Sequence, residues 1–368
     1  MIKLCVPSVG EEDVQAIREV IESKNLVQGK KVLEFEKSIC DYLKVKNAIA
    51  VSSGTAALHL ALMALEISSG DEVIIPDFTF PATANVVEAI GGITKFVDID
   101  LDSLCIDTSK IEEQITDKTK VIIPVQEFGQ SADMEKIITI AKKYNLKVIE
   151  DAACALGAEY KRNMVGTIGD IGCFSLHPRK AITTGEGGIV VTNDDELAEK
   201  IRVLRNHGIK YEDGKAQFVL PGLNYRMTDI QGAMALVQMN KLKDINKKRQ
   251  ELAFEYSTLL SKVEKVRIPV EMKNCKHIWQ TYHIILDEKI DRDKFICKLK
   301  EEGIETNFGA HAVHCQKYYI EKYEYSGYEN AVKAYKQGVA LPLHDRLDKE
   351  SIKFIVDKII SVITFLLK

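Results

Sequence analysis

Short runs of apolar residues, many of them β-branched, recur through the first half of the chain and are separated by helical patterns. These candidate strands contain few polar residues and lie at 48–51, 72–75, 95–97, 121–125, 147–149, 173–176 and 189–191. A strand that is apolar on both faces must be covered on both faces, which is typical of a mostly parallel sheet between layers of helices. The sequence therefore predicts an α/β fold with such a sheet at its centre.

Helices are expected before, between and after these strands, where apolar residues recur at helical spacing, at 11–23, 32–43, 54–65, 81–90, 134–144 and 196–207. The segment 54–65 is apolar on nearly every side, which indicates a buried helix. A long helix is predicted from residue 229 to about residue 260, and its second half carries many charges.

Beyond the long helix the pattern changes to a smaller α+β region, with a strand at 282–286 and helices at 292–302 and from 351 onward. A chain of 368 residues suggests about two domains. We place the boundary at residue 245, which gives a large domain of residues 1–245 and a small C-terminal domain of residues 246–368.

Composition argues against several classes of protein. The net charge is −4 and no segment is densely basic, so binding to nucleic acid is not expected. The eight cysteines are scattered without paired spacing and indicate reduced thiols rather than disulfides. The start of the chain lacks a signal-peptide pattern, and no apolar run approaches the ~20 residues that span a membrane. We therefore expect a cytoplasmic protein that does not bind membranes.

Lys180 lies in an irregular stretch between the candidate strands 173–176 and 189–191. A lysine held there can form a Schiff base with an aldehyde cofactor, provided that the chain also supplies an anion site and a carboxylate. As such a nucleophile and base it needs a lowered pKa, which burial and a cationic neighbour such as Arg179 would supply. A single lysine is more often a surface residue, so the neighbouring residues must show whether Lys180 has a catalytic role.

An anion site is predicted at Ser53, Gly54 and Thr55, which follow a candidate strand and begin a helix. Free N–H groups and the positive end of a helix favour a phosphate, and glycine lets the anion approach the backbone. The same residues would also serve as an ordinary helix N-cap, stabilising by ~1 kcal/mol.

A carboxylate is supplied by Glu150 or Asp151, which follow the candidate strand 147–149. Ligands of such sheets bind beyond the carboxyl ends of the strands. An acid there can hold a pyridine nitrogen protonated, with an ion pair worth about 4 kcal/mol at ~4 Å and an effective dielectric constant of about 20. The alternation of side chains does not decide which acid points inward, and a solvated acidic pair is the alternative. Together with Lys180 and the anion site, however, these acids indicate pyridoxal phosphate (PLP).

Longer motifs carry a family resemblance, and they lie at 26–29, 52–58, 70–76, 79–85, 96–100, 129–134, 148–153, 174–180, 185–188, 205–208 and 224–226. With these motifs in this order, the chain resembles the DegT/StrS family of sugar-nucleotide aminotransferases. The resemblance extends over most of the chain and is looser in the C-terminal third. It implies the type I fold of PLP-dependent transferases, with a smaller C-terminal α+β domain.

The resemblance assigns roles to individual residues. Lys180 would bind PLP covalently and move the proton, and Asp151 would contact the pyridine nitrogen. Gly54, Thr55 and Ser175 would hold the phosphate.

Further roles concern the ring, the partner and the substrate. By the same resemblance Phe80 would stack on the ring, although a core aromatic is the alternative. Asn224 would reach the phosphate of the neighbouring subunit's cofactor, which implies a homodimer with shared active sites. Arg226, His177 and His207 lie in matched motifs and are the candidates for binding the nucleotide sugar.

Two positions depart from the family pattern. Cys154 stands where the family commonly has Gln, sometimes His, touching the phenolic oxygen of the cofactor. Gln126 stands where His usually follows Pro-Val. Because thiols are weak hydrogen-bond partners, Cys154 puts the electronic tuning of the cofactor in question.

The expected reaction transfers an amino group from an amino acid, by resemblance L-glutamate, to a nucleotide-linked keto-deoxysugar. A related branch that removes a sugar hydroxyl has His at the position of Lys180, so transamination is favoured here. Glu186 resembles members that aminate C4 rather than C3. Another PLP-dependent reaction and a non-catalytic regulatory or structural role are the alternatives. His311, His314 and His344 are a poor metal signal, and no metal is expected.

Overall fold

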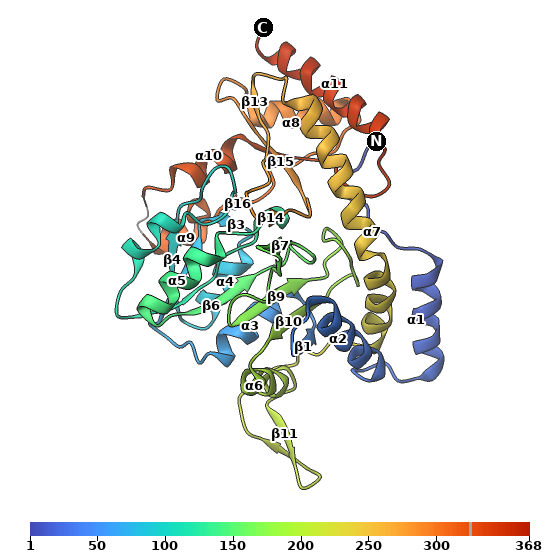
Figure 1. The fold of residues 1–368 in the computed structure, drawn as a ribbon, viewed down its shortest axis with the longest axis vertical. Helices are drawn as coiled ribbons and strands as arrows, with labels where there is room; N and C mark the ends of the chain where they lie inside the picture. The colour runs from blue at the N-terminus through green and yellow to red at the C-terminus, as the bar shows by residue number, and fades with distance from the viewer. Residues whose placement is uncertain (324–325) are drawn as a thin grey trace.

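The central layer of the molecule is a seven-stranded sheet with the order β1-β10-β9-β6-β5-β2-β4 (Figure 1). The computed structural model describes residues 1–323 and 326–368. The strands of this sheet are β1 (Asn47–Val51), β2 (Glu72–Pro76), β4 (Ile93–Val97), β5 (Thr119–Ile122), β6 (Lys147–Asp151), β9 (Ile171–Ser175) and β10 (Gly188–Thr192). Every pairing from β9 to β4 is parallel, and β10 runs antiparallel to β1 and β9. The predicted mostly parallel α/β sheet is confirmed.

Helices cover both faces of this sheet and bury a separate apolar core on each. One face carries α2 (Lys30–Leu43), α5 (Met134–Tyr144) and the first half of α7 (Asp229–Leu260), and the other carries α3 (Gly54–Ala64), α4 (Ala82–Ala89) and α6 (Asp195–Arg205). Alternate strand residues face the two cores: Ile74 lies in the first, and Val73 and Ile75 lie in the second. This is why the strands read as unbroken apolar runs.

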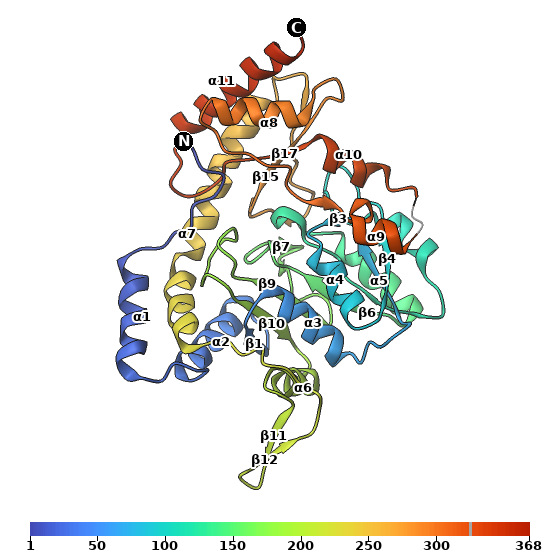
Figure 2. The same ribbon diagram turned by 180° about the vertical axis from the view of Figure 1, so that it is seen from behind.

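The small region is built on a three-stranded antiparallel sheet of β13 (Val266–Arg267), β15 (Tyr282–Leu286) and β17 (Gly338–Leu341). Its core joins these strands to α8 (Arg292–Glu301), α11 (Lys349–Leu366) and the second half of α7. The helix α7 runs unbroken from the core of the large sheet into this one (Figures 1 and 2). The division at residue 245 therefore stays a proposal.

The remaining elements are short or lie at the edges: α1 (Glu11–Ser23), β3 (Phe78–Thr79), η1 (Thr108–Lys110), η2 (Glu112–Gln114), η3 (Glu127–Gly129), β7 (Glu159–Tyr160), β8 (Asn163–Met164), β11 (Ile209–Glu212), β12 (Lys215–Phe218), β14 (Cys275–Lys276), β16 (His311–Ala312), η4 (Val313–Cys315), α9 (Lys317–Lys322) and α10 (Glu329–Gln337). The hairpin β11–β12 projects away from the body of the molecule (Figure 2). Its side chains Tyr211 and Phe218 are exposed. Within the described ranges, no helix combines the length and the apolar character that crossing a membrane requires.

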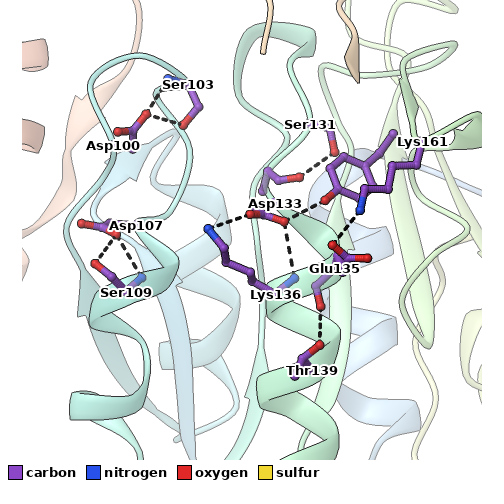
Figure 3. Close-up of polar contacts among 12 residues, drawn as sticks. Asp100, Ser103, Asp107, Ser109, Ser131, Asp133, Glu135, Lys136, Thr139 and Lys161 are labelled. Carbon is purple, nitrogen blue, oxygen red and sulfur yellow. Dashed lines mark hydrogen bonds and ion pairs between the residues drawn. The ribbon is translucent and has the colours of Figure 1, made fainter. Parts of the chain in front are cut away.

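Two features position the edge of the sheet that faces the small region. Strand β5 ends at Ile122, earlier than the predicted 125, because Pro124 cannot donate to the ladder. The helix α5, which leads into β6, is fixed at its start by Asp133, which accepts hydrogen bonds from the Lys136 N–H and the Tyr160 hydroxyl (Figure 3). The sheet edge is thus anchored from its outer flank.

Candidate active site

A cavity of about 440 Å³ opens at the carboxyl ends of β5, β6 and β9, between the large sheet and the small region. Nine of the predicted site residues line it: Ser53, Gly54, Thr55, Phe80, Asp151, Cys154, Ser175, His177 and Lys180. The loop and strand residues Gln280, Asn307 and Leu341 close it from the small region. Residues that lie far apart in the sequence are therefore brought to one place, as expected for a sheet of this topology.

Asp151, the last residue of β6, points into the cavity and is 5% exposed. One carboxylate oxygen accepts a hydrogen bond from the Thr83 hydroxyl at 2.7 Å, and the other accepts one from the Ala153 N–H at 3.1 Å. Burial raises the pKa of Asp151, and these hydrogen bonds together with the charge of Lys180 oppose the rise. The carboxylate is thus held in one orientation toward the cavity.

Glu150 points to the opposite face, which settles the choice that the sequence left open. Its carboxylate accepts hydrogen bonds from the Gly166, Ile168 and Gly169 N–H groups and from the Gln126 side chain. The Gln126 oxygen in turn accepts a hydrogen bond from the Ala132 N–H at 2.8 Å. Gln126 therefore braces two loops behind the sheet edge and does not line the cavity.

Lys180 reaches the cavity from the loop after β9, and its Nζ donates a hydrogen bond to the Cys154 Sγ at 3.0 Å. Burial acts to lower the pKa of Lys180, but Cys154, Asp151 and Glu127 outweigh burial and raise it. The expected lowering of this pKa was wrong, because the groups that act most strongly on the amine are acids. The pKa of the Cys154 thiol is raised by its own burial.

The predicted anion site lies at the start of α3. The Ser53 hydroxyl is already used, since it accepts a hydrogen bond from the Ala56 N–H at 3.0 Å as the N-cap. The next two residues, Gly54 and Thr55, line the cavity beside Ser175. A Cβ on Gly54 would lie 2.9 Å from the Ser175 Cβ, so only glycine permits this approach. The N-cap and the anion site are therefore successive parts of the same helix start.

Phe80 and His177 lie on the walls of the cavity. The Phe80 side chain is 67% exposed, so the alternative of a core aromatic was wrong. His177 accepts a hydrogen bond from the Arg179 N–H at its Nδ1, and burial lowers its pKa. Both side chains present ring surfaces to any group bound in the cavity.

Asn224, Arg226 and His207 do not line the cavity of their own chain. Asn224 and His207 are exposed on the segment that leads to and from the projecting hairpin. Arg226 donates a hydrogen bond to the Asn206 side chain at 2.5 Å and pairs with Val51 in a β-bridge. The three residues thus lie outside the cavity, near the edge strand β1 of the sheet.

Thr83 and Glu127 are polar residues of the cavity that sequence reasoning missed. Thr83 lies on α4 and is brought to Asp151 across 68 residues of sequence, so no local pattern marks it. Glu127 follows the apolar run 121–125 as Asp151 follows its own strand, and that shared position was an available signal.

The His314 ring is held by Asp77 at 2.5 Å and lies 3.3 Å from the Cys315 Sγ.

The donor set of the cavity fits PLP. A lysine amine, a buried carboxylate held by two hydrogen bonds and a helix start with a close glycine are the groups that bind its aldehyde, ring nitrogen and phosphate. Lys180 would bind the aldehyde carbon, Asp151 would contact the ring nitrogen, and Gly54, Thr55 and Ser175 would hold the phosphate.

Comparison with known proteins places these features in a family. The model of the DegT/DnrJ/EryC1/StrS aminotransferase family matches residues 7–360. The spore coat polysaccharide biosynthesis protein SpsC of Bacillus subtilis is 37% identical over 97% of this chain and 96% of its own length. The UDP-4-amino-4-deoxy-L-arabinose–oxoglutarate aminotransferase of Shewanella sediminis is 40% identical over 88% of this chain and 86% of its own length.

The fold of this chain is also similar to the folds of solved aminotransferase structures. The putative sugar aminotransferase Spr1654 of Streptococcus pneumoniae, in its PMP form, superimposes with a TM-score of 0.95 and 26% identity over 100% of both chains. A PLP form of the same protein gives a TM-score of 0.94. The predicted type I fold of PLP-dependent transferases is therefore confirmed.

Proposed function

Because this chain belongs to the DegT/DnrJ/EryC1/StrS aminotransferase family and is a PLP-dependent sugar aminotransferase, we propose that it transfers the amino group of L-glutamate to C4 of a nucleotide-linked keto-deoxysugar. The family predicted from the sequence motifs is confirmed. The identity of the amino donor, the nucleotide linkage of the sugar and the carbon that is aminated are the proposal.

The observation that carries the proposal is the pairing of Lys180 and Asp151 in one cavity. The name of the Shewanella sediminis relative describes oxoglutarate and a UDP-linked sugar with nitrogen at C4. Glu186, which lines the same cavity, agrees with the C4 pattern that the sequence motif suggested. These two observations favour C4 over C3 and L-glutamate as the donor.

The residues of this chain have distinct tasks in the proposed reaction. When bound, PLP supplies the carbonyl that accepts the amino group and a ring that withdraws electrons. Lys180 holds the cofactor and, when released, moves a proton between the substrate carbon and the carbonyl carbon. Asp151, oriented by Thr83, keeps the ring nitrogen protonated by its negative charge. Phe80 excludes water from one face of the ring.

We propose further that the working unit is a homodimer with shared active sites. The lysine and arginine residues that line the cavity are Lys180 and Arg179, whereas Asp151 and Glu186 are acidic. A sugar nucleotide brings a diphosphate, so more positive charge is needed than the described part of one chain supplies. In this proposal the partner provides it.

The projecting segment is the proposed source of the partner's contribution. Tyr211 and Phe218 on the hairpin β11–β12 are 70% and 75% exposed, so the projecting hairpin carries two aromatic side chains that a second chain could cover. Asn224 and Arg226 lie beside the base of this hairpin and face away from their own cavity. We propose that the hairpin packs on the second subunit, that Asn224 reaches its cofactor phosphate, and that Arg226 and His207 bind its nucleotide sugar.

Absorbance spectroscopy tests the proposal directly. The purified protein is loaded with PLP, and its near-ultraviolet and visible spectrum is recorded before and after L-glutamate, with Lys180→Ala alongside. We expect L-glutamate to convert the visible band to that of pyridoxamine phosphate, and a nucleotide 4-keto-sugar to restore it. A band that ignores L-glutamate would point to another donor or another PLP-dependent reaction. Restoration by a 3-keto-sugar alone would overturn the assignment to C4.

A further inference from the structure

Glu127 is a buried acid of the cavity to which the proposed reaction gives no task. It lies just beyond β5, at the start of η3, and is 4% exposed. Its side chain lines the same cavity as Lys180, Asp151 and Cys154. The Phe128 N–H is the backbone group that stabilises its charged form, and no side chain in the described ranges donates a hydrogen bond to its carboxylate.

Charged and titratable groups face Glu127 from two sides. On the cavity side the positive charge of Lys180 favours its ionised form, and the negative charge of Asp151 opposes it. On the other side lie Asp102, His277 and His283. Burial lowers the pKa of His277 to about 3 and that of His283 to about 4, so both rings are neutral near pH 7. Neither histidine therefore compensates a buried carboxylate.

The consequence is a carboxyl group that keeps its proton. Burial raises the pKa of Glu127 to about 8, and the charge of Lys180 lowers it only in part. A protonated carboxyl group has an O–H donor, whereas an ionised one can only accept. Glu127 therefore presents a hydrogen-bond donor to the cavity near pH 7.

Cys154, the residue next to the Lys180 amine, is a poor hydrogen-bond donor. Its Sγ lies 3.0 Å from the Lys180 Nζ, and burial raises the pKa of the thiol, so it stays protonated. A thiol is a weak donor. In PLP the phenolic oxygen is attached to the ring carbon next to the one that bears the aldehyde. Groups that surround the Lys180 Nζ are therefore the groups that surround this oxygen.

We propose that Glu127 is a positioning residue for the cofactor, which as a carboxylic acid donates a hydrogen bond to the phenolic oxygen of PLP that Cys154 binds only weakly. The inference depends on the cofactor, which the family membership establishes, and not on the identity of the sugar. A donor on this oxygen competes with the proton that the oxygen otherwise shares with the lysine nitrogen. Removal of the donor should therefore strengthen the hydrogen bond between the lysine nitrogen and this oxygen.

The test uses the PLP-loaded protein without any sugar substrate. The visible band is titrated from pH 5.5 to pH 9.5, and the PLP dissociation constant is measured, for wild type, Glu127→Leu and Glu127→Gln. We expect Glu127→Leu to raise the titration midpoint by about one pH unit and to weaken PLP binding about tenfold, the effect of one hydrogen bond to a charged group. Glu127→Gln keeps an N–H donor and should stay near wild type below pH 7.

Two further variants make the test specific. Glu127→Leu combined with Cys154→Gln should recover the wild-type midpoint, because the amide restores a donor next to the lysine. Glu186→Gln, which removes another acid of the same cavity, should leave the midpoint unchanged. An unchanged midpoint and an unchanged dissociation constant in Glu127→Leu would overturn the proposal. A normal titration without any response to L-glutamate would contradict the proposed function alone.

Discussion

The cofactor side of the cavity and the side that meets the sugar nucleotide are built in different ways. On the cofactor side, Asp151 accepts hydrogen bonds from Thr83 and Ala153, and Lys180 donates one to Cys154, all within one chain. Of the residues expected to meet the nucleotide sugar, Arg226 and His207 lie outside the cavity of their own chain, beside an exposed hairpin, whereas His177 lines it. The difference indicates that the groups expected to bind the aldehyde and the ring nitrogen of PLP are organised within one chain, whereas in our proposal part of the phosphate and substrate binding depends on a second chain.

The largest expected effect belongs to the cofactor side. Lys180→Ala should lower the rate of the L-glutamate half-reaction by about 10⁴-fold, because the base that moves the proton is lost. Stopped-flow absorbance measures this rate. Lys161→Ala removes a lysine on the outer flank and serves as the control (Figure 3). A loss below tenfold in Lys180→Ala would break the assignment of the base.

Mixing two inactive variants tests the assembly side. Lys180→Ala and the double variant Asn224→Ala/Arg226→Ala should each be nearly inactive with the nucleotide sugar. After joint refolding, half of the dimers would be mixed, and each mixed dimer would have one intact site. We therefore expect about a quarter of the wild-type rate if sites are shared by statistical pairing. No recovery in a mixture shown to contain mixed dimers would place Asn224 and Arg226 in the site of their own chain.

A smaller effect is expected at Thr83. Thr83→Val removes the hydroxyl that donates to Asp151 at 2.7 Å while keeping the shape of the side chain. A hydrogen bond to a charged group is worth about 1.5–3 kcal/mol, so kcat should fall at least about tenfold. Thr139→Val, on α5, is the control because its hydroxyl donates to the Glu135 carbonyl on the outer flank. A change in the sugar KM with kcat intact would contradict the assigned role.

The last effect concerns the loss of folding stability between pH 7 and pH 5, and the size of this loss should be the same at every protein concentration. His277 and His283 are buried, and their folded-state pKa values of about 3 and about 4 lie below the value of about 6.5 for unfolded histidine. Their contribution to stability is therefore present above pH 6.5 and is lost as pH falls, by about 2 kcal/mol each at pH 5.

Urea unfolding at pH 7 and pH 5 measures this loss. His283→Gln cannot be protonated and should show a smaller difference between the two pH values than wild type. An equal difference in both proteins would show that the titration lies elsewhere. A difference that changed with protein concentration would assign it to the dimer.

Much of the fold was predictable because buried strands are unbroken apolar runs. The strands β2 and β10 lie within one residue of their predicted positions. The hairpin β11–β12 was not predicted, since its residues are exposed and alternate without an apolar face. Its form depends on turn geometry and, in our proposal, on a second chain.

The site was predictable where chemistry is local to a motif. Lys180, Asp151 and Gly54 each follow or precede a strand in a recognisable way. The alternation of side chains did not decide between Glu150 and Asp151, because this depends on which loops fold behind β6, and only the family resemblance pointed to Asp151. The pKa of Lys180 was predicted in the wrong direction because the effect of its neighbours Cys154, Asp151 and Glu127 on the amine was not foreseen.

The unbroken helix α7 restricts how this protein can be recombined. Its Arg249 donates to the Lys180 carbonyl at 3.3 Å, midway between the two cores that the helix joins. Exchanging small domains between relatives would require a crossover inside this helix. Each residue added or lost there rotates everything beyond it by about 100° and shifts it by about 1.5 Å. Chimeras with altered sugar preference should therefore tolerate only junctions that preserve the length of α7.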